Sequence, residues 1–195
     1  RLDTRVGQAV LPEVEIVDMR LELTNGNNSV LSHKLCMEIE ETLKQDKQIM
    51  LLINRRGHST FINCRSCGYV LKCEHCDVSM TYHSSTKSLQ CHYCGKTVGV
   101  PEVCPECGSK HIRFFGSGTE KVEAFINERF GEYGVGRMDT DTTTGKEGHR
   151  KILEAFRRKE MHILIGTQMI AKGHDFPEVT LVGILSADSS LYVQD

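Results

Sequence analysis

The sequence lacks a long apolar run, and the longest clear one extends only from Ile49 to Ile53. Crossing a bilayer takes about 20 consecutive apolar residues, so we expect no membrane contact. The N-terminal stretch RLDTRVGQAV also lacks the apolar segment of a secretory signal. We therefore expect a cytoplasmic protein, in which thiols stay reduced and C-x-x-C pairs favour metal over disulfide.

The sequence also lacks an excess of either charge, with 24 Lys and Arg against 26 Asp and Glu and a net charge of -2. Without a strong basic bias, any contact with nucleic acid would have to come from a local patch. The apolar fraction of 39% is enough for a core, and 195 residues can form one large domain or two small ones. Because there is no initiator Met and no capping signal at the final LYVQD, we expect a segment of a longer protein.

Cysteine, in contrast, is abundant, with 9 in the chain. Eight of them form four C-x-x-C pairs in the stretches CRSCGYVLKCEHC and CHYCGKTVGVPEVCPEC. The surrounding residues 59–111 include few branched apolar side chains and many Cys, Gly, His and Ser. Such a segment cannot build a core from side chains alone, and a bound metal can supply the missing cross-links. The ninth, Cys36, lies on a predicted helix and is expected to be a small buried apolar residue.

The spacing of the pairs indicates how they combine. Zinc takes four tetrahedral ligands and one C-x-x-C turn supplies two, so two pairs must meet at each site. Only five residues separate the first two pairs, whereas fourteen separate the two middle pairs, which suits a zinc-ribbon hairpin. We therefore favour a nested arrangement, with an inner site of Cys73, Cys76, Cys91 and Cys94 and an outer site of Cys64, Cys67, Cys104 and Cys107.

Four thiolates leave no open position for water, so both predicted sites would be structural rather than catalytic. An iron–sulfur cluster is the alternative, but the spacing is ribbon-like rather than ferredoxin-like. Four histidines are further potential ligands. With eight thiolates available, we expect them to lie at the surface or to support the ligands by hydrogen bonds: His75, His83, His92 and His111.

The residues on either side of the cysteines have α/β periodicity. Apolar residues recur every four positions from Leu31 to Leu43, which predicts one face of a helix that Ser29 or Ser32 could cap. The short apolar runs QIMLLIN and HILIG are typical of strands buried on both faces. Further strands are predicted for VEIVDM, IRFFG, YGVGRM and VTLVGIL, and further helices for the segments at SGTE, at KEGHRKILEAFRR and at TQMIAKG.

This order of elements predicts a mostly parallel sheet with helices on both faces, interrupted by the Cys-rich segment. Ligands of such sheets bind at the carboxyl ends of strands. Arg55 and Arg56 follow a buried strand there, and Thr167 begins a predicted helix whose amides could hold a DNA phosphate. The alternatives are a solvated turn with a surface ion pair for the arginines, and simple helix capping for Thr167.

The Cys-rich segment also has residues of the kinds that bind DNA. Exposed lysine is common, so a mild positive bias is weak support, and it comes from Arg65, Lys72, Lys87 and Lys96. Three tyrosines could stack on bases or pack over the metal sites: Tyr69, Tyr82 and Tyr93.

The stretch GTQMIAKGHDFPEVTLVGIL, residues 166–185, resembles motif V of superfamily 2 helicases. The stretches LLINRRGH before the cysteines, and FGSGTEKVEAF and RMDTDTTTGKEGH after them, occur together with this motif and an eight-cysteine insertion in one family. Over nearly its whole length the chain therefore resembles the PriA family of bacterial replication-restart helicases.

The resemblance implies an α/β fold, the second RecA-like lobe of an ATP-dependent 3′-to-5′ DNA helicase, with an incomplete sheet and a two-zinc ribbon-type insertion. The lobe would comprise residues 1–58 and 112–195, and the insertion residues 59–111. The nested cysteine pairing is also that of the family. Gly173 and Asp175 lie where such helicases approach the nucleotide, although Asp175 could instead only begin a turn.

The partners that the resemblance implies are forked and single-stranded DNA, other primosome proteins and single-strand-binding protein. The family recognises stalled replication forks and directs primosome assembly, which places it in the bacterial cytoplasm, at the nucleoid. The cofactors it implies are two structural Zn ions in this chain, and ATP and Mg²⁺ in the whole protein.

Motifs for hydrolysing ATP are missing from this chain. GSGTEK is glycine-rich, but its lysine has the wrong spacing for G-x-x-x-x-G-K-[ST]. There is also no DEAH-like motif for Mg²⁺ and no Q-x-x-G-R-x-G-R motif with an arginine finger. We therefore expect this chain alone to be inactive. An alternative function, a zinc-ribbon adaptor that only docks proteins, explains the cysteines but leaves the helicase-like motifs without a role.

Overall fold

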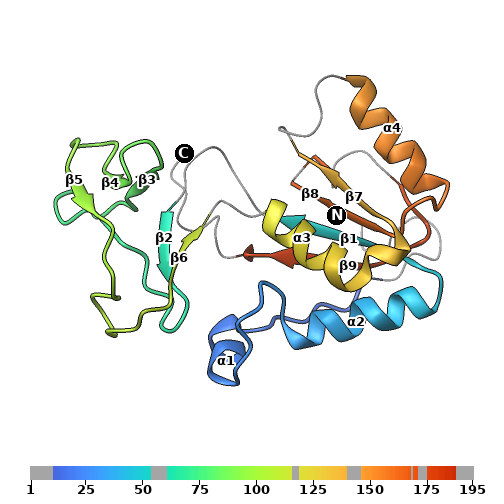
Figure 1. Ribbon diagram of the computed structural model, residues 1–195, viewed down its shortest axis with the longest axis horizontal. Coiled ribbons are helices and arrows are strands. Elements are labelled where there is room, and N and C mark those ends of the chain that lie inside the picture. Colours follow the sequence, from blue (N-terminus) through green and yellow to red (C-terminus); the bar gives the residue numbers. More distant parts are fainter. Residues whose placement is uncertain are drawn as a thin grey trace, which may run out of the picture.

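A computed structural model describes residues 11–53, 61–115, 119–139, 146–167, 169–170 and 175–187. These residues form an α/β lobe and a Cys-rich module, residues 61–115, which lie side by side (Figure 1). None of the helices in the described ranges is long and apolar enough to span a membrane.

The apolar runs form the parallel sheet of the lobe. Strand β1 (Gln48–Ile53) lies between β8 (Ile163–Gly166) and β9 (Val179–Leu185), and β7 (Val135–Met138) pairs with the other side of β8. All pairings in this sheet are parallel. Every residue of β8 is buried, as expected for a strand covered on both faces.

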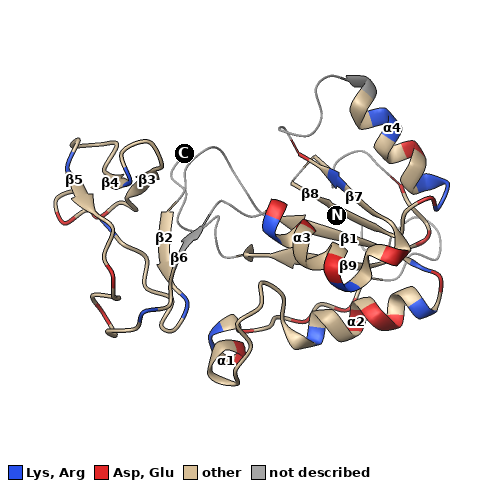
Figure 2. Cartoon of the chain, in the orientation of Figure 1, with Lys and Arg blue, Asp and Glu red and all other residues tan. Residues whose placement is uncertain are grey.

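Helices cover both faces of this sheet, which confirms the predicted α/β architecture. On one face, α2 (His33–Lys44) and α3 (Thr119–Phe130) pack Ile39 and Ile126 against Leu51 of the sheet. On the other face, α4 (Lys146–Arg157) packs Phe156 against Leu164. Figure 2 shows charges of both signs along these helices, as expected for amphipathic helices with one buried face. A short 3₁₀ turn, Gly131–Tyr133, follows α3.

The predicted start of α2 is confirmed. Ser32 is the N-cap, and its Oγ accepts a hydrogen bond from the Leu35 amide at 3.1 Å. Gly183 of β9 explains how closely this helix approaches the sheet. A Cβ there would lie 2.8 Å from Leu51 Cδ2 and 3.1 Å from the Leu35 methyl groups, so a larger residue would push α2 away.

The Cys-rich module consists of two small antiparallel sheets. Strand β2 (Phe61–Cys64) pairs with β6 (Ile112–Phe115), and β3 (Thr81–His83), β4 (Ser88–Gln90) and β5 (Thr97–Gly99) form a three-stranded sheet. The core of the module is small, and two of its five buried residues are metal-ligand candidates: Ile62, Cys73, Met80, Leu89 and Cys91.

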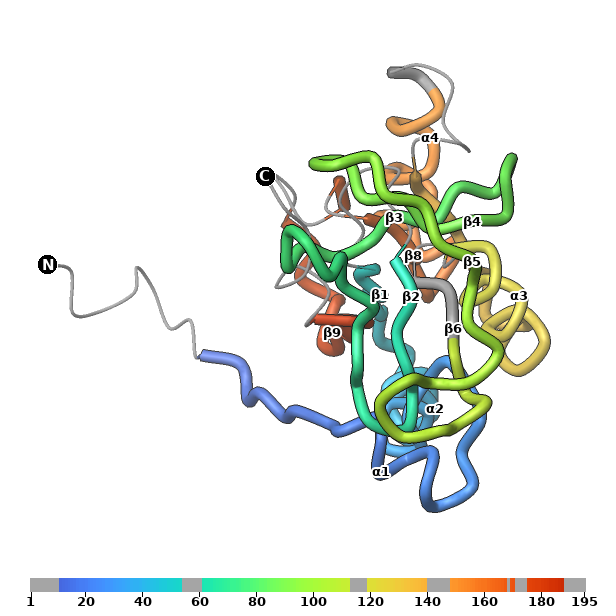
Figure 3. Tube along the Cα trace, turned by 90° about the vertical axis from the view of Figure 1, so that its left-hand side faces the viewer, coloured from blue at the N-terminus to red at the C-terminus, as the bar shows by residue number. Residues whose placement is uncertain are grey.

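Of the predicted strands, VEIVDM is absent, and IRFFG forms a strand in a different sheet from the one expected. Residues 14–18 of the VEIVDM stretch have no regular structure and run away from the lobe (Figure 3), and Met19 begins helix α1 (Met19–Thr24). The Asp18 side chain caps that helix by accepting from the Arg20 amide at 2.8 Å, and Ile16 is 93% exposed. The IRFFG stretch does form a strand, but it pairs antiparallel with β2 rather than joining the parallel sheet.

The helix predicted for TQMIAKG lies mostly outside the described residues. Of this stretch the structure describes Thr167 as a bend and Met169 and Ile170 as a turn. Ser117, the first residue of the SGTE stretch, also lies outside the described residues, and the helix predicted at that stretch is α3.

Candidate metal centres

Each of the four C-x-x-C pairs forms the same type of local turn. In each, the backbone amide four residues after the first cysteine donates to that cysteine's carbonyl, at 2.8 to 2.9 Å. The donor residue has a positive φ, which favours glycine. Three of the four donors are therefore glycine and the fourth is an aspartate: Gly68, Gly95, Gly108 and Asp77. This turn points both sulfurs of each pair to one side.

The turns bring the cysteines together in two groups of four, Cys64, Cys67, Cys104 and Cys107, and Cys73, Cys76, Cys91 and Cys94, the nested arrangement that the spacing favours. The sulfurs of each group lie within 4.8 Å of one another. The Cys64–Cys107 and Cys73–Cys94 sulfurs are 3.6 Å apart, too far for a disulfide. Tetrahedral zinc with Zn–S bonds of about 2.3 Å separates its sulfur ligands by about 3.8 Å. The donor sets therefore fit zinc.

Burial follows the same pattern in both groups. The first and third cysteines are buried, the second is half-buried and the fourth, Cys94 or Cys107, is exposed. Four thiolates complete a tetrahedron and leave no position for a substrate or a reactive water. Both centres are therefore suited to cross-linking the module and not to catalysis.

In each group one thiol is poised to ionise first. Burial alone would raise the pKa of Cys64, but hydrogen bonds from the Cys67 and Ser66 amides lower it to about 7. Amides of Cys94 and then Tyr93 likewise lower the pKa of Cys91 to about 7. A thiolate that is already formed is the natural first ligand for an incoming cation.

Other thiols of the same groups hold their protons until a metal displaces them. Burial raises the pKa of Cys67 to about 12. The pKa of Cys76 is raised to about 12, first by hydrogen bonding with the Cys94 thiol. Binding zinc at neutral pH must therefore release protons, and low pH opposes binding.

Neither group of metal-ligand candidates among the described residues includes a histidine. His83 and His92 pack against each other beside the inner site, with ring centroids 5.3 Å apart. His111 Nδ1 forms a hydrogen bond with Ser109 Oγ at 3.1 Å. Ser109 Oγ in turn forms a hydrogen bond with Ser66 Oγ at 2.8 Å. The serine pair joins the two turns of the outer site, and the sequence reasoning missed it because its members are 43 positions apart.

Three of the positively charged side chains of the module have local partners. Lys72 pairs with Asp77 at 3.1 Å, and Lys96 pairs with Glu74. Arg65 is only 8% exposed and donates to backbone carbonyls, so it is not a free surface charge as its sequence context suggested.

Of the three tyrosines in the Cys-rich module, Tyr93 alone is strongly exposed, at 68%. Tyr69 lines a small apolar space beside the outer site, and Tyr82 packs on the core of the module. Of the three, Tyr93 is therefore the one whose ring is free to stack on another molecule.

The predicted contacts at the carboxyl edge of the sheet are only partly described. Arg55, Arg56 and Gly173 lie outside the described residues. Thr167 follows β8 directly and is half-buried, and its carbonyl accepts from the Ile170 amide at 3.1 Å. Asp175 is exposed and precedes β9.

A buried polar network at the same edge was not predicted. Thr119, the first residue of α3, donates its hydroxyl to Asp139 Oδ2 at 2.9 Å, and Asp139 is 2% exposed. Arg137 lies between this carboxylate, at 3.4 Å, and Glu123, at 2.8 Å. The network fixes the start of α3 to the end of β7. The sequence carries its members in the stretches GTEKVE and RMD, but gives no signal that they meet.

Comparisons with known proteins match both parts of the structure. Residues 73–98, which span the inner site, match the PriA DNA helicase Cys-rich region (CRR) domain. Residues 104–195 match the Helicase conserved C-terminal domain. The replication restart protein PriA of Bacillus subtilis is 54% identical over 194 residues, covering 100% of this chain. The chain belongs to the PriA family.

Other PriA-family relatives match along the full chain as well. The replication restart protein PriA of Synechocystis is 48% identical and that of Treponema pallidum 43% identical, each over 100% of this chain. The chain covers 24% of the Bacillus and Synechocystis proteins and 29% of the Treponema protein. It therefore spans about a quarter of the length of the PriA relatives it matches.

Proposed function

We propose that this chain is part of an ATP-dependent 3′-to-5′ DNA helicase that recognises stalled replication forks and directs primosome assembly. The observation that carries the proposal is a helicase C-terminal lobe whose chain is interrupted, between β1 and α3, by a module with two Cys₄ sites. The relatives of the chain are named replication restart proteins. An adaptor would need the module, but it would have no use for the lobe.

Within the whole protein, this segment would form one wall of the nucleotide cleft. Gly173 and Asp175 would approach the nucleotide, while ATP and Mg²⁺ would be held mainly by motifs that this chain does not have. The carboxyl edge of a parallel sheet is where such ligands bind. Asp175 is an exposed carboxylate in the segment that connects the carboxyl end of β8 to the start of β9. The segment alone would therefore not hydrolyse ATP.

The DNA contacts we propose lie at Arg55, Arg56 and Thr167, and on the Cys-rich module. Thr167 follows β8 at the carboxyl end, and the exposed ring of Tyr93 supports a stacking contact on the module. Forked and single-stranded DNA would be the substrates. The name of the relatives supports replication-restart partners, which would be other primosome proteins and single-strand-binding protein at the nucleoid in the cytoplasm.

Unwinding by the full-length protein tests this function. The wild-type protein is expected to unwind a forked duplex only with ATP and Mg²⁺, and to lose fork affinity steeply as salt rises. Asp175→Ala should lower the unwinding rate by about 100-fold, since misplacing a group at the reacting nucleotide costs that much. Glu128→Ala, a change at an exposed acidic position on α3, is the matched control and should leave the rate unchanged.

The outcomes separate the candidate functions. A full-length protein that neither prefers forks nor unwinds them would refute the helicase proposal and favour a protein-docking adaptor. Wild-type unwinding by Asp175→Ala would leave the helicase standing and remove only the nucleotide role of that residue.

A further inference from the structure

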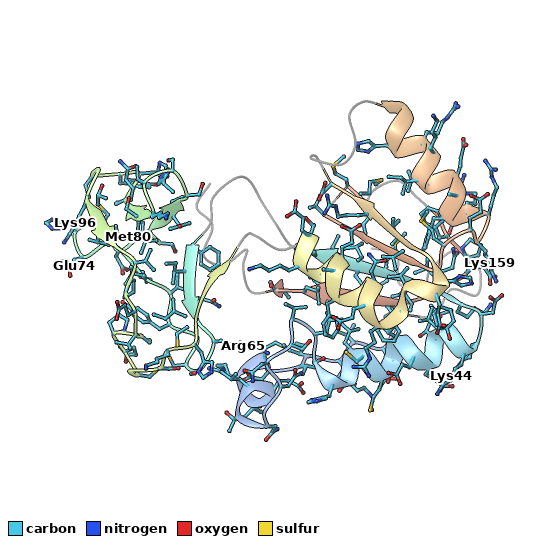
Figure 4. The ribbon with its side chains drawn as sticks, viewed as in Figure 1. Lys44, Arg65, Glu74, Met80, Lys96 and Lys159 are labelled. Carbon is cyan, nitrogen blue, oxygen red and sulfur yellow. The ribbon has the colours of Figure 1, made fainter. Side chains whose placement is uncertain are left out.

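Arg65 of the outer metal site contacts the lobe. Arg65 lies between the first two cysteines of that site and is 8% exposed. Its Nη1 donates to the Asn28 carbonyl and its Nη2 to the Asn27 carbonyl, both at 2.8 Å. Figure 4 shows Arg65 at the junction between the Cys-rich module and α1. A planar guanidinium presents two Nη groups side by side to adjacent acceptors, whereas lysine has a single nitrogen on a shorter side chain.

The loop that receives Arg65 is held in place by its own hydrogen bonds. The Asn27 amide donates to the Glu22 carbonyl at 2.8 Å, and the Asn27 side chain donates to the Leu31 carbonyl at 2.9 Å. The Ser29 amide donates to Asn27 Oδ1 at 2.8 Å. Leu31 is 1% exposed and belongs to the core of the lobe. The two carbonyls are therefore fixed relative to the lobe.

On the other side, Arg65 is fixed by the outer site. Its amide donates to the His111 carbonyl at 2.9 Å. The hydroxyl of its neighbour Ser66 forms a hydrogen bond with the hydroxyl of Ser109. The Arg20 side chain of α1 also lies against Gly68 of the same turn. A Cβ added at Gly68 would lie 3.7 Å from Arg20 Cδ. The position of Arg65 thus depends on the two turns that the outer metal holds together.

The inner site has different surroundings at the equivalent position. The residue that follows its first cysteine is Glu74, whose side chain is 82% exposed and pairs with Lys96 of the same module. That ion pair links two parts of the module and does not reach the lobe.

We propose that Arg65 fixes the orientation of the Cys-rich module on the lobe, so that the metal of the outer site, unlike that of the inner site, is coupled to the lobe surface. Arg65 is a positioning residue, and through it the order of the loop at residues 25–32 depends on the outer metal. The two sites then differ in role, although both have four thiolates. This inference stands independently of the helicase function.

Hydrogen–deuterium exchange of the full-length protein tests the role of Arg65. Arg65→Ala should speed exchange in a peptide covering residues 25–33 by about tenfold or more, because two charge-assisted hydrogen bonds to that loop are lost. Arg65→Lys should also speed it, since the shorter lysine with its single nitrogen does not reproduce the two parallel Nη donors. Lys96→Ala, which removes a cation of the inner-site surroundings, is the control and should leave this peptide unchanged. Wild-type exchange in Arg65→Ala or Arg65→Lys would overturn the proposal.

A second pair of variants leaves Arg65 in place, so it decides the matter even if Arg65→Ala fails to fold. Cys107→Ser and Cys94→Ser each remove the exposed fourth ligand of one site. Cys107→Ser should speed exchange in residues 25–33, and Cys94→Ser should speed exchange only inside the module. Equal effects of the two variants on residues 25–33 would contradict a coupling specific to the outer site.

Discussion

Removing zinc with a strong chelator is expected to unfold the Cys-rich module while the parallel sheet of the lobe stays folded. The module has strands of three or four residues and a small core that itself includes Cys73 and Cys91. A core of this size supplies at most about 3–5 kcal/mol, whereas a structural zinc contributes about 10–16 kcal/mol. The lobe has its own apolar cores on both faces of the sheet, and zinc contributes to neither.

Hydrogen–deuterium exchange measures both parts at once. After chelation, amides of β3, β4 and β5 should exchange as in an unfolded chain, and those of β1 and β8 should stay protected. Protection of the module without metal, or loss of protection in β8, would contradict this division.

Acid should act in the same direction as the chelator. The pKa values of Cys67 and Cys76 are raised to about 12, so both thiols are protonated at neutral pH and must lose those protons to bind zinc. A fall in pH therefore strengthens the competition from protons, and a rise weakens it. Less chelator should be needed to unfold the module at pH 6 than at pH 8.

Phe156→Ala should destabilise the lobe by about 3–5 kcal/mol, the usual cost of deleting a buried aromatic ring. Phe156 is fully buried, packs with Met138 and Leu164, and meets the Phe176 ring edge to face at a centroid distance of 5.2 Å. The variant keeps the Phe156 carbonyl, which accepts from the buried Gln48 side chain at 2.6 Å, so the loss reports on the ring.

Native-state exchange of β8 amides in the full-length protein gives the free energy of opening the sheet. Met37→Ala is the control, because Met37 is 59% exposed on α2 and its truncation should change that free energy by less than about 0.5 kcal/mol. A loss below about 1 kcal/mol in Phe156→Ala would show that the α4 face of the sheet is not a packed core.

Local signals accounted for most of the lobe. Ser32 caps α2 by a contact three residues away, and ILIG is apolar at every position because both of its faces are covered. The grouping of the cysteines also followed from local geometry, because a C-x-x-C turn fixes two sulfurs and the connecting lengths restrict which turns can meet.

The errors came from contacts between distant residues. Val14 and Ile16 alternate as in a strand, but no described strand pairs with them and both are exposed. Ile112–Phe115 has the composition of a strand, and nothing in it shows that its partner is β2 and not the parallel sheet. Arg65 has the sequence context of a surface cation, and it is buried because carbonyls 37 and 38 positions away receive it. Partners at such distances leave no trace in a local pattern.

The central claim is that the eight paired cysteines form two separate closed zinc sites in a nested arrangement. The most direct test is the metal content per chain, measured by elemental mass spectrometry on wild type, Cys94→Ser and Cys107→Ser purified without added zinc. The account predicts two zinc ions in the wild type and one in each variant. One zinc in the wild type, or iron in its place, would contradict it.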